Sequence, residues 1–215
     1  MDKGNIKELI SEHKVIAIIR DIHEQKIIQT VESLLEGGIN LVEVTLNHVS
    51  LNAVEETTKK IHMINEQFKG DVCVGAGTVL TSDQVISTVQ AGAEFIISPN
   101  VEESVIKKTN ELGKVSIPGA LTPSDMVTAY NLGADFVKLF PAGELGLNYV
   151  KAVMAPLRHI PVIAVGGITP ENIPPLIELG IRGIGVGGNL IQQKAIQENQ
   201  FEHITNLAKR YKNSI

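Results

Sequence analysis

VIAVGGITPENIPPLIELGIRGIGVGGNL, residues 162–190, contains one full copy of the pattern that decides the fold. The apolar run 162–167 ends in two glycines, and Thr169-Pro170 then has the form of a helix cap followed by a proline in the first turn. Gly180 follows an amphipathic stretch, at the position where many helices end in a left-handed residue. A second apolar run, 183–188, also ends in two glycines. The stretch therefore predicts a strand, a helix and a second strand.

The same pattern repeats along the whole chain. Continuous runs rich in Val and Ile are typical of strands that are buried on both faces, as in a parallel sheet covered by helices. The stretches between these runs have apolar residues at helical spacing. One predicted helix face consists of Leu51, Val54, Ile61, Ile64 and Phe68. The predicted strands cover residues 15–19, 41–46, 72–77, 94–98, 114–117, 135–140, 162–167 and 183–188.

The ends of the predicted helices carry the residues that usually begin and end a helix. The segments Thr81-Ser-Asp-Gln84 and Thr122-Pro-Ser-Asp125 have the form of capping boxes. Glycines at positions 38, 92, 113 and 133 follow amphipathic stretches, as Gly180 does, and are predicted to end helices in the left-handed conformation.

About eight strand-then-helix units in 215 residues predict an α/β fold, a single (β/α)8 TIM barrel domain over residues 1–215, because such barrels begin at roughly 200 residues. An open doubly wound sheet is the alternative. No Pro/Ser-rich linker or low-complexity segment marks a second domain. Nucleotide-binding motifs are incomplete, because Gly75-Ala-Gly77 lacks a third glycine and Asn189 stands where a P-loop needs lysine.

The composition argues against several classes of function. There are 19 Lys and Arg against 24 Asp and Glu, a net charge of -5, and no basic block, so we expect no binding to nucleic acid or membrane. No apolar run approaches the ~18 residues of a membrane span. The single cysteine, Cys73, cannot form an intramolecular disulfide, and the first ten residues lack the features of a signal peptide. These features predict a cytoplasmic protein.

Lys138 is the most informative residue near a strand end, because it interrupts the otherwise apolar run 136–140. Lysine is almost never buried without a specific reason. Alternation along a strand places Lys138 on the same face as Phe136 and Phe140, where loss of solvent favours the neutral amine. A neutral amine is the nucleophile that forms a Schiff base with a carbonyl substrate. The structural alternative is a lysine that extends past the strand end to water.

Glu43 interrupts a second apolar run, 41–46, and shares its face with Thr45. A glutamate in apolar surroundings donates and accepts protons near neutral pH, which imine chemistry requires. The alternative is a structural ion pair with Lys138 or Arg20. Both Lys138 and Glu43 are therefore candidate catalytic residues.

Two pairs of glycines, Gly166-Gly167 and Gly187-Gly188, end the seventh and eighth runs. Many barrels bind phosphate at this place with backbone N–H groups and a short helix that Asn189 is expected to cap. Tight turns use glycine pairs equally, and this is the structural alternative.

We expect no metal and no cofactor. Of six histidines only His48 lies near a strand end, and no pair has the spacing of metal ligands. Cys73, between Val72 and Val74, is expected to be a buried core thiol.

Seven motifs, in the same order along the chain, resemble those of a known family. This family comprises the class I, Schiff-base aldolases that cleave 2-keto-3-deoxy-6-phosphogluconate (KDPG) or its galactonate epimer, and that are also known as 4-hydroxy-2-oxoglutarate (KHG) aldolases. The resemblance covers essentially the whole chain and implies a (β/α)8 barrel, commonly a homotrimer, that needs no metal. The motifs are VEVTLN (42–47), GAGTVL (75–80), ISPN (97–100), PG (118–119), FVKLFPA (136–142), AVGGITPEN (164–172) and GVGGNL (185–190).

The resemblance implies a role for each candidate residue. Lys138 corresponds to the Schiff-base lysine and Glu43 to the general acid/base, while Thr78 and Pro99 line the keto-acid pocket. The implied phosphate cradle consists of Gly166, Gly167, Gly187, Gly188 and Asn189. The implied substrates are a phosphorylated 2-keto-3-deoxy sugar acid and pyruvate.

One position departs from the pattern of the gluconate-type members. Many of them carry an arginine that holds the substrate carboxylate where this chain has Asn47. Here Arg20 ends the first run instead, a pattern similar to the galactonate-type branch, while Glu43-Val-Thr45 is closer to the gluconate type. Alternation places Arg20 toward the barrel mouth, where it is expected to bind an anionic group bidentately. Thr45 is a further candidate substrate-binding residue. The preferred substrate therefore stays open among the two epimers and KHG.

Two other functions remain open from the sequence. A sugar-phosphate isomerase or epimerase would share the glycine pairs but use Lys138 only as an electrostatic group. An inactive phosphosugar-binding relative would be consistent with the missing arginine at position 47.

Overall fold

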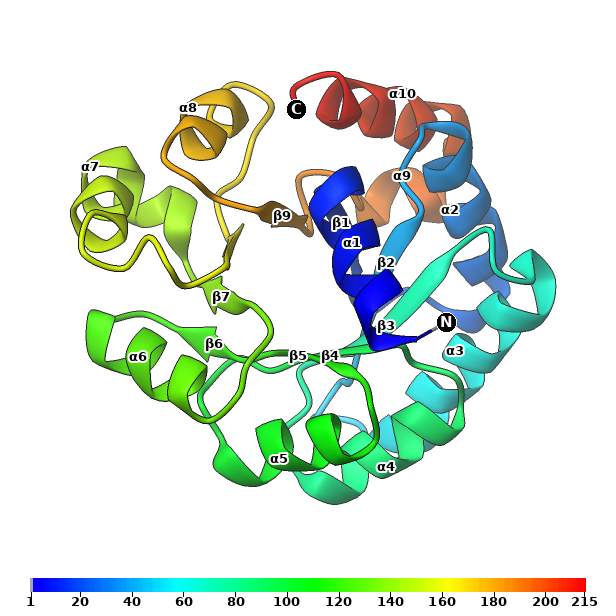
Figure 1. Cartoon of the computed structure of the whole chain (residues 1–215). Helices are drawn as coiled ribbons and strands as arrows, with labels where there is room; N and C mark the ends of the chain where they lie inside the picture. Colours follow the sequence, from blue (N-terminus) through cyan, green and yellow to red (C-terminus); the bar gives the residue numbers. More distant parts are fainter. Residues whose placement is uncertain (1) are drawn as a thin grey trace.

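The predicted apolar runs form the parallel strands of a barrel, and the amphipathic stretches form helices around it (Figure 1). The computed structural model describes residues 2–215. Hydrogen-bonded neighbours follow the order β5-β4-β3-β2-β1-β9-β8-β7-β6. The strands are β1 (Val15–Ile19), β2 (Leu41–Thr45), β3 (Cys73–Gly77), β4 (Phe95–Ile97), β5 (Val115–Ile117), β6 (Gly119–Ala120), β7 (Val137–Leu139), β8 (Val162–Val165) and β9 (Gly183–Val186).

The strands β5 and β6 are two halves of one barrel position that Pro118 interrupts. Proline has no N–H group to donate to a neighbouring strand. The half before it pairs with β4 and the half after it pairs with β7. The carbonyls of Ser116 and Pro118 also accept hydrogen bonds from the N–H groups of Phe136 (3.3 Å) and Lys138 (2.8 Å), so the ladder continues to β7. The (β/α)8 barrel is confirmed, and the open doubly wound sheet is excluded.

The helices begin and end largely at the predicted residues. Thr122 and Asp125 form the predicted capping box, and Thr81 accepts from the N–H of Gln84. The five glycines predicted to end helices, at 38, 92, 113, 133 and 180, all have positive φ. The helices are α1 (Lys3–His13), α2 (Glu24–Glu36), α3 (Ala53–Phe68), α4 (Ser82–Gln90), α5 (Glu103–Glu111), α6 (Pro123–Asn131), α7 (Ala142–Met154), α8 (Ile173–Glu178), α9 (Gln193–Gln197) and α10 (Phe201–Lys212).

Two predictions about helices α8 and α3 were wrong. Thr169 does not cap a helix, because α8 begins only at Ile173. The side chain of Asn172 closes the preceding loop by accepting from Thr169 N (3.0 Å) and donating to Gly167 O (2.8 Å), so the helix starts later. Leu51 does not belong to the packed face of α3, since it lies in the loop before that helix and is fully exposed.

The helix α1 closes one end of the barrel (Figure 1) and was not predicted. Its side chains Ile6 and Ile10 are fully buried and pack against the interior cluster of the barrel. This cluster contains Ile16, Ile18, Leu41, Cys73, Phe95, Ile97, Val115, Ile117, Phe136, Ile163 and Val165. The amino-terminal end of the barrel is therefore filled by apolar side chains.

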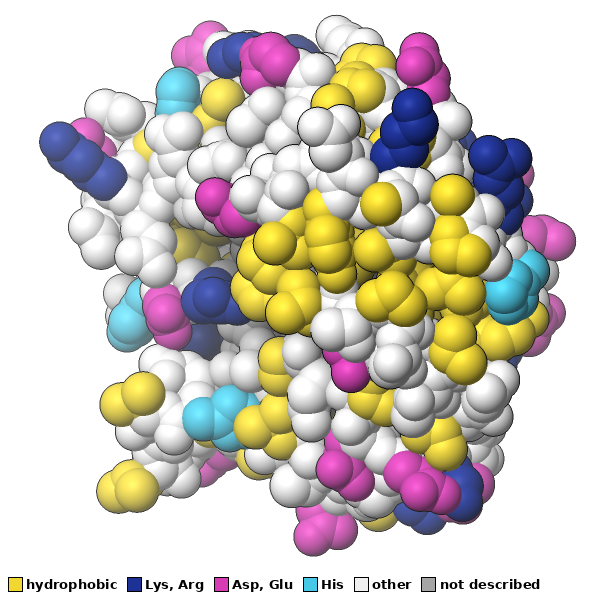
Figure 2. Space-filling view, turned by 90° about the vertical axis from the view of Figure 1, so that its left-hand side faces the viewer, with side chains coloured by type: hydrophobic (Ala, Val, Ile, Leu, Met, Phe, Trp, Pro, Cys, Tyr) yellow, Lys and Arg dark blue, Asp and Glu magenta, His cyan; other side chains and the backbone are white. Residues whose placement is uncertain are grey.

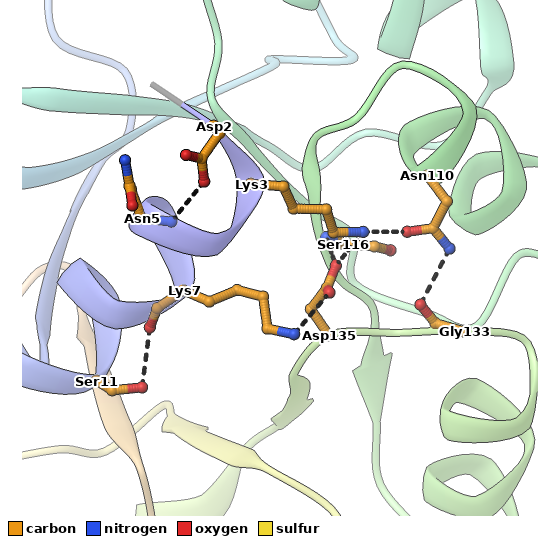
Figure 3. Close-up of polar contacts among 9 residues, drawn as sticks. All are labelled: Asp2, Lys3, Asn5, Lys7, Ser11, Asn110, Ser116, Gly133 and Asp135. Carbon is orange, nitrogen blue, oxygen red and sulfur yellow. Dashed lines mark hydrogen bonds and ion pairs between the residues drawn. The ribbon is translucent and has the colours of Figure 1, made fainter.

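Two lysines of α1 attach the helix to the barrel through one aspartate, as Figure 3 shows. Lys3 Nζ lies 2.8 Å and Lys7 Nζ 3.4 Å from the carboxylate of Asp135, which precedes β7. The same carboxylate accepts a hydrogen bond from Ser116 N at 2.9 Å. Because this end is closed, access to the interior is left to the carboxyl ends of the strands.

No helix within residues 2–215 has the length and apolarity that a membrane crossing requires.

Candidate active site

A cavity of about 320 Å³ opens at the carboxyl ends of the strands, opposite α1. Strand ends of a parallel barrel meet at one mouth, so side chains far apart in sequence line the same space. Of the predicted site residues, all except Glu43 and Thr45 line this cavity. They are Arg20, Thr78, Pro99, Lys138, Gly166, Gly167, Gly187, Gly188 and Asn189.

Lys138 reaches the cavity from the middle of β7. It is only 8% exposed and lies beside Gly119 and Ile163 of the neighbouring strands. Its Nζ lies 5.3 Å from the ring centroid of Phe140, which stands half-exposed at the mouth. Among the described residues, no carboxylate lies within 4.0 Å of this amine. The lysine is thus buried in the cavity wall without a direct ion pair.

Glu43 lies in the barrel interior beneath the cavity and is 1% exposed. Its strand neighbours are Ile18 on β1 and Gly75 on β3. Burial raises the pKa of this carboxyl above its ordinary value, and the charges of Lys138 and Arg20 oppose that shift. Its Oε2 has no hydrogen-bond partner, although it is buried. Such a carboxyl keeps its proton to higher pH than an ordinary glutamate, which suits it to both donating and accepting a proton.

Thr45 does not reach the cavity, although alternation placed it on the same face as Glu43. It is buried, and its Oγ1 donates to the carbonyl of Ile19 at 3.3 Å, while its own carbonyl accepts from Thr57 Oγ1 at 3.4 Å. The hydroxyl donates its hydrogen within the protein, and the contact of Thr45 with substrate stays a prediction.

Arg20 stands at the end of β1, is exposed, and lines the cavity mouth. Thr78 and Pro99 line the cavity as well. The backbone of Pro99 packs closely against Gly119. A Cβ built on Gly119 would lie 2.4 Å from the carbonyl carbon and oxygen of Pro99. This glycine therefore allows the loop after β4 to reach the cavity wall.

The two glycine pairs present unused backbone donors to the cavity. The N–H groups of Gly167, Gly188 and Asn189 make no hydrogen bond within residues 2–215. Gly166 and Gly167 both have positive φ, and Gly166 O accepts from Gly143 N at 2.7 Å. Consecutive free N–H groups of this kind form a concave site for an anion.

Asn189 does not cap a helix as predicted. The helix α9 begins four residues later, after Gln192, and has no side-chain cap. Instead Asn189 Nδ2 donates to the carbonyl of Ile168 at 3.0 Å, which also accepts from Tyr211 OH at 3.1 Å. The side chain thereby connects the two glycine loops to each other.

Glu144, at the start of α7, also lines the cavity and was missed by sequence reasoning. It follows Pro141, and a residue outside the strand ends carries no signal in the strand pattern.

Cys73 is buried as predicted, and burial raises the pKa of its thiol to about 12. Residues 2–215 contain no group of three or more His, Cys, Asp or Glu able to hold a metal ion.

Comparisons with known proteins identify similar chains. A protein family described as KDPG and KHG aldolase has a model that matches residues 6–207. The chain is 31% identical to 2-dehydro-3-deoxy-6-phosphogalactonate aldolase of Escherichia coli (strain K12) over 202 residues, 94% of this chain and 96% of that protein. It is 26% identical to 2-dehydro-3-deoxy-phosphogluconate aldolase of Haemophilus influenzae over 206 residues, 95% of this chain and 93% of that protein.

A solved structure matches in the same way. KDPG aldolase from Legionella pneumophila, with pyruvate captured at low pH as a covalent carbinolamine intermediate, has a TM-score of 0.82 and 26% identity. The match covers 94% of this chain and 96% of that chain.

Proposed function

The chain belongs to the KDPG and KHG aldolase family, and from that premise we propose that Lys138 forms the Schiff base through which it releases pyruvate from its substrate. Aldolases of this family are lyases, and so is this protein. The proposed substrates are KDPG, its galactonate epimer and KHG. The aldehyde product is then glyceraldehyde 3-phosphate or glyoxylate.

The observation that carries the proposal is the placement of an amine and a carboxyl at one barrel mouth. Lys138 is buried in the cavity wall with no carboxylate in direct contact, so its Nζ is available to a carbonyl carbon. Glu43 lies beneath it with a pKa that burial raises. A single carboxyl of this kind serves both as acid and as base in successive steps.

The proposed reaction begins when Lys138 Nζ attacks the C2 ketone of the substrate. Glu43 gives a proton to the resulting carbinolamine hydroxyl, water leaves, and a protonated imine forms. The C4 hydroxyl then loses its proton to Glu43 as the C3–C4 bond breaks, and the bonding electrons move to the imine nitrogen. The aldehyde departs, and a pyruvate enamine stays on the lysine. Protonation at C3 by Glu43 or a water that it positions, followed by hydrolysis, frees pyruvate.

The two ends of the substrate have separate proposed sites. Thr78 and Pro99 line the end that takes the keto acid, and Arg20 supplies a guanidinium for an anionic group in place of the arginine missing at Asn47. The free N–H groups of Gly167 and Gly188 take the phosphate, within the cradle of Gly166, Gly167, Gly187, Gly188 and Asn189. The net charge of -5 is compatible with this anionic substrate, because the donors act locally.

The protein is proposed to form a homotrimer. Figure 2 shows a broad hydrophobic area on the side of the barrel that carries α6 and α7. Large exposed patches mark interaction sites, and a ring of three copies buries one such face of each chain against its neighbour. Exposed apolar side chains of these two helices include Val127 of α6 and Leu145 and Leu147 of α7, and exposed Leu121 lies just before α6. Light scattering on the purified protein tests this, and the mass of a single chain would contradict it.

The protein is also proposed to act in the cytoplasm, since a phosphorylated sugar acid does not cross membranes unaided. Cell fractionation with an antibody to the chain tests the location.

Borohydride reduction in the presence of pyruvate tests the catalytic proposal directly. We expect a covalent adduct on the peptide that carries Lys138, and no adduct with Lys138→Ala. An isomerase or epimerase would give no adduct. An inactive relative would release no pyruvate from either phosphorylated epimer or from KHG in an assay coupled to lactate dehydrogenase, and this result would contradict the proposed reaction.

A further inference from the structure

Thr78 lines the cavity in a backbone conformation that a threonine rarely adopts. Its φ is +57°, in the left-handed region, where a β-branched side chain is strained. Such a residue keeps this conformation only when its surroundings hold it there. The contacts of the backbone around Thr78 therefore decide how its side chain is presented to the cavity.

Three hydrogen bonds hold the two peptide groups on either side of Thr78. On the amino-terminal side, the carbonyl of Gly77 accepts from Leu46 N at 2.9 Å. On the carboxyl-terminal side, Val79 N donates to Ile97 O at 3.2 Å. The carbonyl of Thr78 itself accepts from His48 Nε2 at 2.7 Å. The peptide group after Thr78 is thus hydrogen-bonded at both its carbonyl and its N–H, and His48 makes the bond to the carbonyl.

The histidine acts here as a hydrogen-bond donor. A carbonyl oxygen only accepts, so Nε2 of His48 carries a hydrogen in this contact. His48 is the one histidine near a predicted strand end, and it follows the carboxyl end of β2.

The turn that presents His48 is organised by Asn47. The Oδ1 of Asn47 accepts from Val49 N at 3.0 Å, and its carbonyl accepts from Ser50 N at 2.9 Å. Asn47 stands where many gluconate-type members carry a carboxylate-binding arginine. In this chain the same position shapes a turn, and the turn delivers an imidazole to the loop after the next strand.

We propose that His48 is a positioning residue that holds Thr78 in the conformation needed at the keto-acid end of the cavity. It acts through the carbonyl of Thr78 and does not touch the substrate. This inference rests on the proposed function, in which Thr78 lines the pocket for the carbonyl substrate. A histidine with only a local role in its loop would leave the affinity for pyruvate unchanged.

His48→Ala tests the proposal against wild type and His48→Gln. Loss of this hydrogen bond is expected to raise the pyruvate concentration for half-maximal borohydride trapping about 3- to 10-fold, with KM for cleavage rising more than kcat falls. The amide nitrogen of glutamine occupies nearly the place of Nε2, so His48→Gln should restore most of the affinity. The matched control is His62→Ala, which should behave as wild type. His62 is an exposed histidine of α3 that does not line the cavity.

A second measurement follows the backbone without substrate. Hydrogen exchange of the segment 75–80 should be faster in His48→Ala, because the peptide group after Thr78 loses one of its two anchors, and normal in His48→Gln. Unchanged exchange and unchanged pyruvate affinity in a folded His48→Ala would overturn the inference. Absence of an adduct in wild type would instead reject the proposed function, while the exchange result would still test whether His48 holds Thr78.

Discussion

Gly77 and Glu43 are in direct contact across two neighbouring strands of the barrel. A Cβ built on Gly77 would lie 1.7 Å from Oε1 of Glu43 and 2.6 Å from its Cγ, so no side chain fits at this position. The strand β3 passes the carboxyl with bare backbone because residue 77 is a glycine. The second glycine of the GAGTVL motif, Gly77, therefore does more than permit a turn. It leaves the space that the buried carboxyl of Glu43 occupies.

Gly77→Ala is expected to displace the carboxyl of Glu43 and to reduce kcat by about 100-fold or more, since displacements near 1 Å can have effects of that size. Pyruvate release by the purified variant measures this, and circular dichroism shows whether the barrel is intact. If the substitution acts through Glu43, the double variant Gly77→Ala/Glu43→Gln should be no slower than the slower single variant. Multiplied effects in the double variant would show that Gly77 matters for another reason.

Glu43→Gln is expected to reduce kcat by about 10²- to 10⁴-fold, because the proposed proton-transfer group is lost. It should also change how stability depends on pH. Burial raises the pKa of Glu43 above its ordinary value of 4.5, so the folded protein keeps this proton to higher pH than the unfolded chain does. The contribution of the carboxyl to stability is therefore fully present below about pH 4.5 and is lost as the pH rises through the folded-state pKa.

Urea unfolding of wild type and Glu43→Gln at several pH values between 4 and 9 measures this second effect. The glutamine cannot ionise, so the free energy of unfolding of the variant should improve relative to wild type as the pH is raised. Parallel pH profiles for the two proteins would mean that Glu43 ionises in the folded protein as readily as in the unfolded chain.

The strands and the barrel were predictable because they depend on local patterns. Runs such as 15–19 and 162–165 are apolar on both faces, and only a parallel sheet covered by helices buries both. The helix α1 has no comparable signal, since its buried residues Ile6 and Ile10 pack against the barrel interior, which several distant strands create together. Pro118 directly follows the predicted run 114–117, and the short strand β6 after it was not predicted, because only its pairing with β7 shows that the barrel continues there.

The site was predictable as far as strand ends meet at one mouth. That rule placed Lys138, Thr78 and Pro99 at the cavity. Thr45 does not line the cavity, because alternation gives only the face of a strand and not the hydrogen bond to Ile19 O that its hydroxyl makes there. The proposed roles of His48 and Glu144 depend on the paths of the segments that follow the strands, which no periodicity records.

Glu144→Gln is expected to improve binding of phosphorylated substrates. A Cβ built on Gly167 would lie 2.9 Å from Glu144 Oε1, so this carboxylate stands beside the proposed phosphate cradle. Repulsion between the carboxylate and a phosphate dianion should weaken binding, by about 2- to 5-fold in KM for an exposed group. KM for KDPG should therefore fall in the variant, and added salt should reduce the difference.

Glu178→Gln, an exposed glutamate at the end of α8 that does not line the cavity, is the matched control. Trapping of pyruvate, which has no phosphate, should be the same in both variants and in wild type. If Glu144→Gln needed less pyruvate than wild type for half-maximal borohydride trapping, the carboxylate of Glu144 would lie at the keto-acid end of the cavity instead.

The attachment of α1 allows a comparison between apolar packing and an ion pair within one helix. Ile10 is fully buried against the barrel interior, and removing its side chain to the β-carbon should lower the free energy of unfolding by about 2–4 kcal/mol. Lys7 is 45% exposed beside Asp135, which Lys3 also contacts, so Lys7→Ala should lower the free energy of unfolding by less than about 1 kcal/mol.

Urea unfolding of Ile10→Ala and Lys7→Ala measures both values, and the rate of pyruvate release separates stability from catalysis. Below the unfolding transition, neither variant should change kcat, because α1 closes the end of the barrel opposite the cavity. A larger loss of stability in Lys7→Ala than in Ile10→Ala would mean that the ion pairs with Asp135, and not the buried isoleucines, hold the helix in place. A fall in kcat of a fully folded Ile10→Ala would show that packing at the closed end extends through the interior to Lys138 and Glu43.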